Sequence, residues 1–367
     1  MPDRRPLMFA YWGRRGGVCR FTFNLAEAVA NRNDASTTIS ISRSNEIFNE
    51  FLPFERFIFP VSTFTSTLGA ITQVAPLMRL RRDLAARFAA DRTVAIVSLL
   101  SHVWSPLIAP VIRRARVRHI VVVHDVDAHM GDPSGIAHSW RLLEARTADH
   151  IVALSHAVAE RLALANRIPK EKITVLFHPD LDYGKPVDDS APQGAALRVL
   201  FLGRILAYKG LGLFVEAVEI LRRQGVAIEA SVFGAGDLGE YAGRLAALGA
   251  EVKNRWISDH EFKAILARHD AAVLTHVKAS QSGVVSAAFG AGLPVVVTPV
   301  GGLIEQVDPD VTGIVADGVS AEAIARAIRR LADDRALLHR LRRGVAATAQ
   351  SRSMERFFDS ITAVALG

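Results

Sequence analysis

Short apolar runs, each followed by a stretch with helical patterning, recur along almost the whole chain of 367 residues. Two of these runs, Ile-Val-Val-Val at 120–123 and Pro-Val-Val-Val at 294–297, have no polar side chain on either face. Continuous Val/Ile runs are typical of parallel strands that are buried on both faces. The alternation therefore predicts an α/β fold built from doubly wound parallel sheets.

A break in this pattern at residues 179–196 predicts two domains. Pro, Gly, Asp and Ser replace the large apolar residues there, and a new α/β series begins at residue 197. We expect an N-terminal Rossmann-like domain over 1–180 and a C-terminal one over 197–350, facing a central cleft that holds the ligand. Strands are expected at 7–12, 38–41, 57–61, 94–99, 119–123 and 150–154, and then at 197–203, 230–233, 272–275 and 295–298; helices are expected at 21–30 and 77–90.

The composition narrows the class of protein. Half of the residues are hydrophobic, 22% are charged, and one is Cys. These values exclude a disordered tail, a disulfide scaffold and a cysteine-rich metal protein. A single thiol, Cys19, fits a reducing compartment, and the N-terminal residues contain no apolar run of signal-peptide length. We therefore expect a cytoplasmic protein.

The positive charge is concentrated in one window. The net charge is +7, and residues 79–118 hold nine Arg against two Asp, so this window alone accounts for it. Local basic clusters attract phosphates, for example on anionic lipid head groups. The alternative is a solvated helix face, and nucleic acid is disfavoured because no aromatic interleaving or recognition motif accompanies the arginines. The residues expected to meet an anionic membrane surface are Arg79, Arg81, Arg82, Arg113 and Arg114.

The segment Leu-Phe-Leu-Gly-Arg-Ile-Leu-Ala-Tyr-Lys-Gly at 200–210 suggests an anion site. Arg204 directly follows the glycine that ends a buried strand, and Lys209 precedes a long helix. Unpaired amides at a helix N-terminus favour an anion, and two cations add charge-assisted hydrogen bonds. The pattern fits the binding of a diphosphate, and the alternative is a pair of ordinary loop-end charges.

A second anion site is suggested by Ala-Ser-Gln-Ser-Gly-Val-Val at 279–285. Ser282 and Gly283 precede a helix of small residues, so the amides of Gly283 and Val284 are placed to face a phosphate. After the next strand, two glycines at 301–302 permit close approach of a ligand, and Glu305 offers an acceptor for sugar hydroxyls. The alternatives are a helix cap, turn glycines and a solvated glutamate.

Taken in order, these motifs resemble a known family. FLGRxxxYKG, SQSGV and GLPVVVTPVGGLxE are similar to the nucleotide-sugar-binding domain of GT-B glycosyltransferases, especially glycosyltransferase family 4. The N-terminal half agrees through the glycines at 16–17, VVVHD at 121–125 and ADHIVALSHAVAERL at 148–162. The resemblance implies a GT-B architecture in which the first domain, 1–180, binds the acceptor and the second, 197–350, binds the nucleotide sugar. It also implies that the terminal helix at 351–367 returns to the first domain.

The resemblance also implies roles for individual residues. It places the donor diphosphate on Arg204 and Lys209, and a glycine of the first domain, Gly17, close to that diphosphate. It implies that His124 touches the transferred sugar. The remaining donor-binding positions that it implies are Gly16, Ile257 (near the base), Lys278, Ser282, Gly283, Val284 and Glu305.

One departure from the family concerns two glutamates that members usually carry eight residues apart. Depending on the alignment, Ala279 and Ala287 or Lys278 and Ser286 occupy these positions. Two acceptors for donor hydroxyls are therefore missing, while Lys278 is suited to a negatively charged sugar or a phosphate. This departure leaves the donor sugar and the stereochemical outcome open.

The catalytic candidates follow a buried strand of the first domain. An inverting transfer needs a base for the acceptor hydroxyl, which Asp125 or Asp127 can supply, whereas a retaining transfer leaves His124 to orient the sugar. We expect His178 to be structural. The sequence HDVDAH at 124–129 is interpreted as a chance loop, so no metal or other cofactor is expected, and no adjacent base supports Cys19 as a nucleophile.

The resemblance predicts a glycosyltransferase that moves a sugar from a UDP- or GDP-linked donor to a hydroxyl acceptor. The expected acceptor is a lipid-linked or glycan molecule of bacterial exopolysaccharide or lipopolysaccharide assembly, at the inner membrane face. We expect retention of configuration, with inversion as the alternative. Two other functions stay open: a silent homologue that binds or scaffolds, and a sugar-nucleotide epimerase of the same fold.

Overall fold

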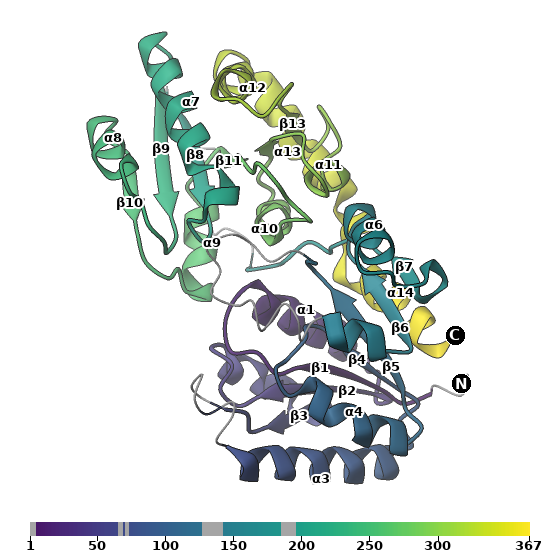
Figure 1. Cartoon of the computed structure of the whole chain (residues 1–367). Helices are drawn as coiled ribbons and strands as arrows, with labels where there is room; N and C mark the ends of the chain where they lie inside the picture. Colours follow the sequence, from purple (N-terminus) through teal and green to yellow (C-terminus); the bar gives the residue numbers. More distant parts are fainter. Residues whose placement is uncertain (1–4, 65–68, 70–72, 127–141, 185–195) are drawn as a thin grey trace. The chain divides into compact units, whose positions relative to one another are not determined.

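The computed structural model describes residues 5–64, 69, 73–126, 142–184 and 196–367. Within these residues the chain forms two compact units (Figure 1). Unit 1 contains the described residues up to Phe177 together with Met354–Gly367, and unit 2 contains His178–Ser353. The chain thus enters unit 2 after Phe177 and leaves it after Ser353.

Unit 1 is built on a parallel sheet with the strand order β3-β2-β1-β4-β5-β6-β7 in the described residues. Its strands are β1 Leu7–Tyr11, β2 Thr37–Ser42, β3 Ile58–Val61, β4 Ala95–Ser98, β5 Arg118–Val123, β6 His150–Ala153 and β7 Ile173–Val175. Its α-helices are α1 Gly17–Asn31, α3 Val74–Asp91, α4 Ser105–Arg114, α6 His156–Leu164 and α14 Met354–Leu366. The order reverses direction between β1 and β4, which makes this pair the switch point of the sheet.

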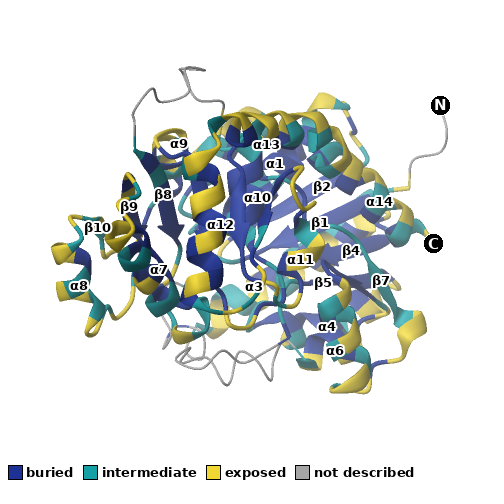
Figure 2. Cartoon of the chain, turned by 90° about the horizontal axis from the view of Figure 1, so that it is seen from above, coloured by how far each residue is buried: buried dark blue, intermediate teal, exposed yellow. Residues whose placement is uncertain are grey.

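Helices cover both faces of this sheet because its buried strands are apolar on both sides. On one face, Met8 of β1 and Ile96 of β4 pack with Leu84 of α3 and Ile112 of α4. On the other face, the ring of Phe9 lies 5.8 Å from that of Phe358 in α14. Figure 2 shows most of the strands in dark blue, and it shows yellow on the outer surfaces of the helices.

Unit 2 repeats this architecture with the strand order β10-β9-β8-β11-β12-β13. Its strands are β8 Leu197–Leu202, β9 Ile228–Phe233, β10 Glu251–Lys253, β11 Ala271–Leu274, β12 Val295–Val297 and β13 Gly313–Val315. Its α-helices are α7 Leu211–Arg223, α8 Tyr241–Ala247, α9 Asp259–Ala267, α10 Gly283–Gly290, α11 Leu303–Gln306, α12 Ala321–Asp333 and α13 Arg335–Thr348.

Alternate residues of β8 divide the core of unit 2 into two layers. Val199 and Phe201 pack with α7, α12 and α13, whereas Leu200 and Leu202 pack with α9, α10 and α11. Side chains of a strand point to opposite faces in turn, so one apolar run supplies both layers. The prediction of two Rossmann-like α/β domains is confirmed.

The last helix, α14, belongs to unit 1 although it follows unit 2 in the sequence. Phe357 packs edge-on against Phe21 of α1 with ring centroids 5.2 Å apart, and Asp359 forms an ion pair with Arg32. Among the described residues, no helix combines the length and the apolar character that a membrane crossing requires.

The elements differ from the expected ones in a few places. The strand expected at 57–61 begins at Ile58, because a 3₁₀ helix, Phe48–Phe57, precedes it. The first helix begins at Gly17 rather than at Phe21. Three strands of three residues each, β7, β10 and β13, were not expected, since such short segments carry little periodicity.

Candidate functional site

The carboxyl edge of the unit 2 sheet brings three predicted segments together. Gly203 follows β8 with φ +114°, a conformation that favours glycine. A Cβ atom on Gly203 would lie 3.2 Å from Nζ of Lys209 and 3.6 Å from Cγ2 of Val284 in α10. The strand end, the lysine before α7 and the first turn of α10 therefore meet at one point, and a side chain at position 203 would crowd it.

Lys209 is held in place through its main chain. It ends the 3₁₀ turn Ala207–Lys209, and Gly210 follows in the left-handed conformation as the N-cap of α7. The hydroxyl of Thr275, just after β11, donates to the carbonyl oxygens of Lys209 at 2.9 Å and Gly210 at 2.8 Å. A Cβ atom on Gly210 would lie 2.1 Å from the main-chain carbonyl oxygen of Thr275, so only glycine fits at this position.

The ammonium group of Lys209 is electrostatically unfavourable in the unliganded protein. Burial, followed by the positive charge of Arg204, lowers the pKa of Lys209 to about 8. The described residues provide no carboxylate partner for this ammonium, while the Arg204 side chain is exposed. An anion placed between the two cations would relieve the cost, because opposite charge favours the protonated form.

A side chain that the sequence did not predict, Gln306, braces the start of α10. Its Oε1 accepts the Ser282 amide hydrogen at 2.7 Å, and its Nε2 donates to the Ser282 carbonyl oxygen at 3.2 Å. The Ser282 hydroxyl accepts the Val284 amide hydrogen at 3.3 Å, which leaves the Gly283 amide without an acceptor among the described residues. The one sequence signal for Gln306 was its position directly after Glu305.

The glycines at 301 and 302 brace the loop before α10. Gly301 has φ +45°, and a Cβ atom there would lie 1.9 Å from the Ala279 carbonyl oxygen. That same oxygen accepts the Gly302 amide hydrogen at 3.2 Å. The two glycines therefore allow two main-chain segments of the protein to approach each other closely. Glu305 follows in the short helix α11, where its side chain is exposed.

The positions of the absent glutamates contain no carboxylate in either alignment. Ala279 and Ala287 are buried in the apolar layer of α10, and Lys278 is exposed. Ser286 is buried, and its hydroxyl forms a 2.7 Å hydrogen bond with Nδ1 of His178. Ser286 therefore faces the segment that enters unit 2, in agreement with the structural role expected for His178.

Ile257, the residue expected near the base, has its side chain in the core of unit 2 beside α9. A ligand at this position therefore has access to its main chain rather than to its side chain. The neighbouring Trp256 is more exposed, at 38%.

In unit 1, the predicted glycines lie at the start of α1. Gly16 has φ +105°, and its amide donates to Oε1 of Glu46 at 3.0 Å. A Cβ atom on Gly17 would meet no atom within 4 Å, so the space beside the first turn of α1 is open. Cys19 lies buried behind this turn with its sulfur 3.5 Å from the Tyr11 hydroxyl.

His124 follows β5, and a hydrogen bond fixes its ring. Nε2 donates to the carbonyl oxygen of Leu99 at 2.9 Å, and the ring of Phe21 packs edge-on at 5.8 Å. Burial lowers the pKa of His124, so the ring is neutral at pH 7 and Nδ1 carries a lone pair. Asp125 is half-buried beside it, and Asp127 lies outside the described residues.

The described residues contain no group of three His, Cys, Asp or Glu side chains placed to hold a metal ion. Residues 127–129 of the HDVDAH segment lie outside the described part of the chain. The structure thus offers no candidate metal centre in the residues that it describes.

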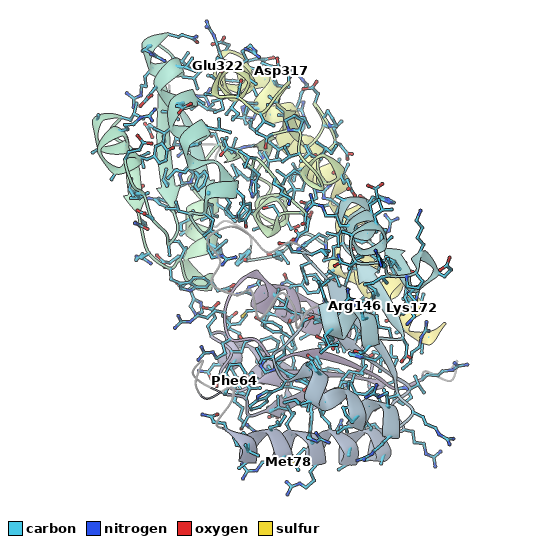
Figure 3. All side chains as sticks on the ribbon, viewed as in Figure 1. Phe64, Met78, Arg146, Lys172, Asp317 and Glu322 are labelled. Carbon is cyan, nitrogen blue, oxygen red and sulfur yellow. The ribbon has the colours of Figure 1, made fainter. Side chains whose placement is uncertain are left out.

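The arginine-rich window forms α3, α4 and the segments around them. Arg82 pairs with Asp83 at 2.8 Å, and Arg81 donates to the Leu107 carbonyl oxygen at 2.9 Å. Arg79, Arg113 and Arg114 are exposed, with no ion-pair partner in the part of the chain that the structure describes. Figure 3 shows Met78 projecting outward from α3, where Val74 is exposed as well, at 60%.

Two family models match the chain, one in each half. The model described as Glycosyltransferase Family 4 matches residues 15–179, and the model described as Glycosyl transferases group 1 matches residues 196–334. Together they cover most of the chain, and the boundary between them lies in the segment predicted as an interdomain linker.

Two curated relatives match about half of this chain. An uncharacterized glycosyltransferase of Methanocaldococcus jannaschii is 24% identical over 219 residues, covering 55% of this chain and 56% of the relative. The amylovoran biosynthesis glycosyltransferase AmsK of Erwinia amylovora is 29% identical over 187 residues, covering 47% and 45%. The chain thus spans about half the length of the curated relatives that it matches.

Solved structures match over almost the full length. HepE of Anabaena, solved in complex with UDP-glucose, gives a TM-score of 0.72 at 17% identity and covers 98% of this chain and 99% of its own. A glycosyltransferase of Rickettsia africae gives a TM-score of 0.71 at 16% identity, with 99% of both chains covered. At these identities the likeness establishes the fold.

Proposed function

Because the chain belongs to the GT-B glycosyltransferases, with a family 4 domain followed by a group 1 domain, we propose that it transfers a sugar from a nucleoside-diphosphate sugar to a hydroxyl acceptor. UDP is the favoured nucleotide, because the similar structure of HepE was solved with UDP-glucose. A GDP-linked donor is the alternative, and the test below includes GDP.

The proposal is carried by two cations, Lys209 and Arg204, that lie close together at the carboxyl edge of the unit 2 sheet. Lys209, with its pKa lowered to about 8, lies beside Gly203 and Arg204 and near the first turn of α10. A diphosphate bound there gains charge-assisted hydrogen bonds from both cations and an amide hydrogen bond from Gly283. This arrangement needs no resident metal, because the protein's own cations neutralise the leaving group.

These residues act when the bond between the sugar and the diphosphate breaks. The electron pair of that bond leaves with the diphosphate, and Lys209 and Arg204 stabilise the charge that develops there. The acceptor oxygen bonds to the anomeric carbon, and its proton passes to a diphosphate oxygen in a retaining transfer. In an inverting transfer the proton passes to a carboxylate, for which Asp125 and Asp127 are the candidates.

The acceptor is proposed to be a glycan or a lipid-linked sugar at the inner membrane face. Two similar proteins support this: AmsK is a glycosyltransferase of amylovoran biosynthesis, and WaaG is a glycosyltransferase involved in lipopolysaccharide biosynthesis. The exposed Val74 and Met78 of α3, together with the exposed arginines, suit an anionic membrane surface. Replacing Arg79, Arg81 and Arg82 with Glu is expected to abolish flotation with vesicles that contain anionic lipid, and unchanged flotation would contradict this.

The donor assignment is tested by thermal shifts with UDP, GDP and ADP. We expect one nucleotide to raise the Tm of the wild type, and we expect Lys209→Ala to lose that response. Lys170→Ala, an exposed lysine of unit 1, is the matched control and should respond as the wild type does. Equal responses of the wild type and Lys209→Ala would overturn the assignment.

A catalytically silent homologue is the second candidate, and one observation favours it. The positions of both missing glutamates hold Ala, Lys or Ser, so two acceptors for donor hydroxyls are absent. A silent protein would bind the nucleotide through Lys209, yet release no UDP from UDP-glucose with any acceptor. Release of UDP that depends on an added acceptor excludes this candidate, and it also separates transfer from epimerisation.

A further inference from the structure

A set of cations at the amino edge of the unit 1 sheet takes no part in the proposed donor site. The strands β1, β4, β5, β6 and β7 are parallel neighbours in this order, so their amino ends follow one another along one edge. Each of these strands is preceded by at least one cation. The amino-edge cations are Arg5 before β1, Arg92 before β4, Arg116 before β5, Arg146 before β6, and Arg167, Lys170 and Lys172 before β7.

Hydrogen bonds hold the segments that carry the amino-edge cations side by side. The Arg118 amide donates to the Val94 carbonyl oxygen at 2.9 Å. Nζ of Lys172 donates to the Ala148 carbonyl oxygen at 3.3 Å. Neighbouring strands lie about 4.8 Å apart, so five strands distribute the cations along a line of about 19 Å. Figure 3 shows Arg146 and Lys172 on the side of unit 1 where Figure 1 marks the C-terminus.

The amino-edge cations have no carboxylate partners in the described part of the chain. All of them are exposed except Lys172, which is half-buried. The exposed carboxylates of the same segments are Glu171 and Asp149, which accepts the His119 amide hydrogen at 2.8 Å. In unit 2, by contrast, exposed arginines are paired with carboxylates, as in Arg255, Arg268, Arg326, Arg329, Arg330 and Arg340.

Three of the amino-edge cations occupy a backbone conformation that favours glycine. Arg92, Arg116 and Arg167 follow helices that end at this edge, and their φ angles are 55°, 57° and 54°. Cations near a helix C-terminus can bind its last carbonyl oxygens. None of these three side chains donates a hydrogen bond to a described residue, so they do not cap the helices that they follow. The three side chains are available to a partner.

The positive charge at this edge also acts on a histidine. His150 begins β6, and its pKa is lowered by burial and then by the positive charges of Arg118 and Lys172. A lowered pKa means that the ring is neutral at pH 7. An edge with so many cations and so few carboxylates attracts a polyanion.

The form of the cluster distinguishes between classes of polyanion. The described segments that carry the amino-edge cations contain no aromatic residue on which a base could stack, which disfavours single-stranded nucleic acid. The cations follow the strands one after another, so they repeat about every 4.8 Å along the edge. This repeat is close to the length of one sugar residue in a polysaccharide chain. The cluster therefore fits a linear chain with a negative charge on successive sugars.

We propose that the amino-edge cations bind an acidic polysaccharide whose sugars carry carboxylates, each of which pairs with a cation of the edge. The choice of a polysaccharide rests on the proposed function, whereas the positive charge of the edge does not depend on it. This surface is distinct from the reacting groups, because His124 follows the other end of β5. The six residues of β5 span about 20 Å, so the surface holds sugars remote from the one that reacts.

The test is the binding of a fluorescently labelled oligogalacturonate to the full chain, measured by anisotropy at low salt, where surface charges are least screened. The variant Arg92→Asn/Arg116→Asn/Arg167→Asn removes three charges, and asparagine tolerates the left-handed conformation. We expect its Kd to rise about tenfold, because each exposed ion pair contributes a small factor. Its Tm should equal that of the wild type, and neutral dextran should bind to neither protein.

The matched control is Arg326→Gln/Arg329→Gln/Arg330→Gln, which removes the same charge from unit 2. We expect this control to bind oligogalacturonate as the wild type does. An unchanged Kd for the asparagine variant, or equal weakening in the variant and the control, would overturn the proposal. Tighter binding of a single-stranded oligonucleotide of equal charge, or of vesicles with anionic lipid, that is lost in the asparagine variant would assign the surface to that partner and overturn the polysaccharide.

Lys209→Ala separates this proposal from the donor assignment. We expect Lys209→Ala to bind oligogalacturonate as the wild type does, while its Tm no longer responds to UDP. A wild type that binds no UDP would refute the donor site, and the oligogalacturonate titration would still decide on the amino-edge cations. A wild type that binds UDP but no oligogalacturonate would refute the polysaccharide surface alone.

Discussion

At the scale of single residues, the site in unit 2 depends on Lys209, whose charge no carboxylate of the described residues neutralises. Thr275 fixes the main chain of Lys209, and Gly203 leaves the space that its ammonium occupies. The pKa of Lys209 is lowered to about 8 by burial and by the charge of Arg204. The unliganded protein therefore bears a cost that a bound anion removes.

This cost has a definite pH dependence. The folded pKa of Lys209, about 8, lies below the ordinary lysine value of 10.5, so between these pH values the unfolded chain binds more protons than the folded one. The contribution of Lys209 to the free energy of unfolding therefore rises as the pH increases from about 8 to 10.5. Urea denaturation across this range should show a steeper rise for the wild type than for Lys209→Met, and parallel profiles would contradict the assignment.

At the scale of elements, the segment that enters unit 2 is tied to the segment that leaves it. Arg352 Nε donates to the two carboxylate oxygens of Asp180 at 3.0 and 3.2 Å, and its guanidinium lies 4.6 Å from the ring centroid of Phe289 in α10. The Leu181 amide also donates to the Ser286 carbonyl oxygen at 3.0 Å. These contacts connect α10, whose first turn belongs to the donor site, to both connections of unit 2.

Arg352→Ala is expected to be costly because it leaves the largely buried carboxylate of Asp180 without its partner. We expect unit 2 to lose about 3–5 kcal/mol in its free energy of unfolding, measured in urea. Asp180→Asn should cost less than Arg352→Ala, because it removes the buried negative charge together with the ion pair. A decrease of less than about 1 kcal/mol in the free energy of unfolding for Arg352→Ala would contradict this prediction, because exposed ion pairs contribute no more than that.

Sequence reasoning predicted the elements whose causes are local. The strands β5, β8 and β12 carry continuous apolar runs, and their Val-rich composition indicates burial on both faces. The hydrogen bond between the Gln306 side chain and Ser282 was not predicted, because it joins residues 24 positions apart. The hydrogen bond between His178 and Ser286, which was not predicted either, joins residues 108 positions apart. Such contacts arise from the packing of the sheet, which periodicity does not encode.

At the scale of the whole molecule, each unit has a core of its own, and the end of the chain completes the first one. Phe357 and Phe358 of α14 pack on Phe21 and Phe9, so unit 1 requires residues from both ends of the sequence. The resemblance of the motifs to a family predicted the return of this helix, whereas composition and periodicity gave no sign of it.

Phe357 is fully buried, so its loss should destabilise unit 1. We expect Phe357→Ala to cost about 3–5 kcal/mol, the usual range for a buried aromatic side chain. Calorimetry should show a lower transition temperature for unit 1 and an unchanged Tm increase on addition of UDP, which binds to unit 2. Ala363→Ser, on the exposed side of α14, is the control, and equal Tm values for the two variants would contradict the packing of this helix.

The central claim is that Lys209 binds the diphosphate of the donor, and calorimetric titration with UDP near pH 8.5 tests it most directly. A bound diphosphate raises the pKa of the lysine from about 8, so titrations in two buffers of different ionisation enthalpy should reveal proton uptake on binding. Lys209→Met should bind UDP at least tenfold more weakly and take up no such proton. Equal affinity and equal proton uptake in the two proteins would contradict the account.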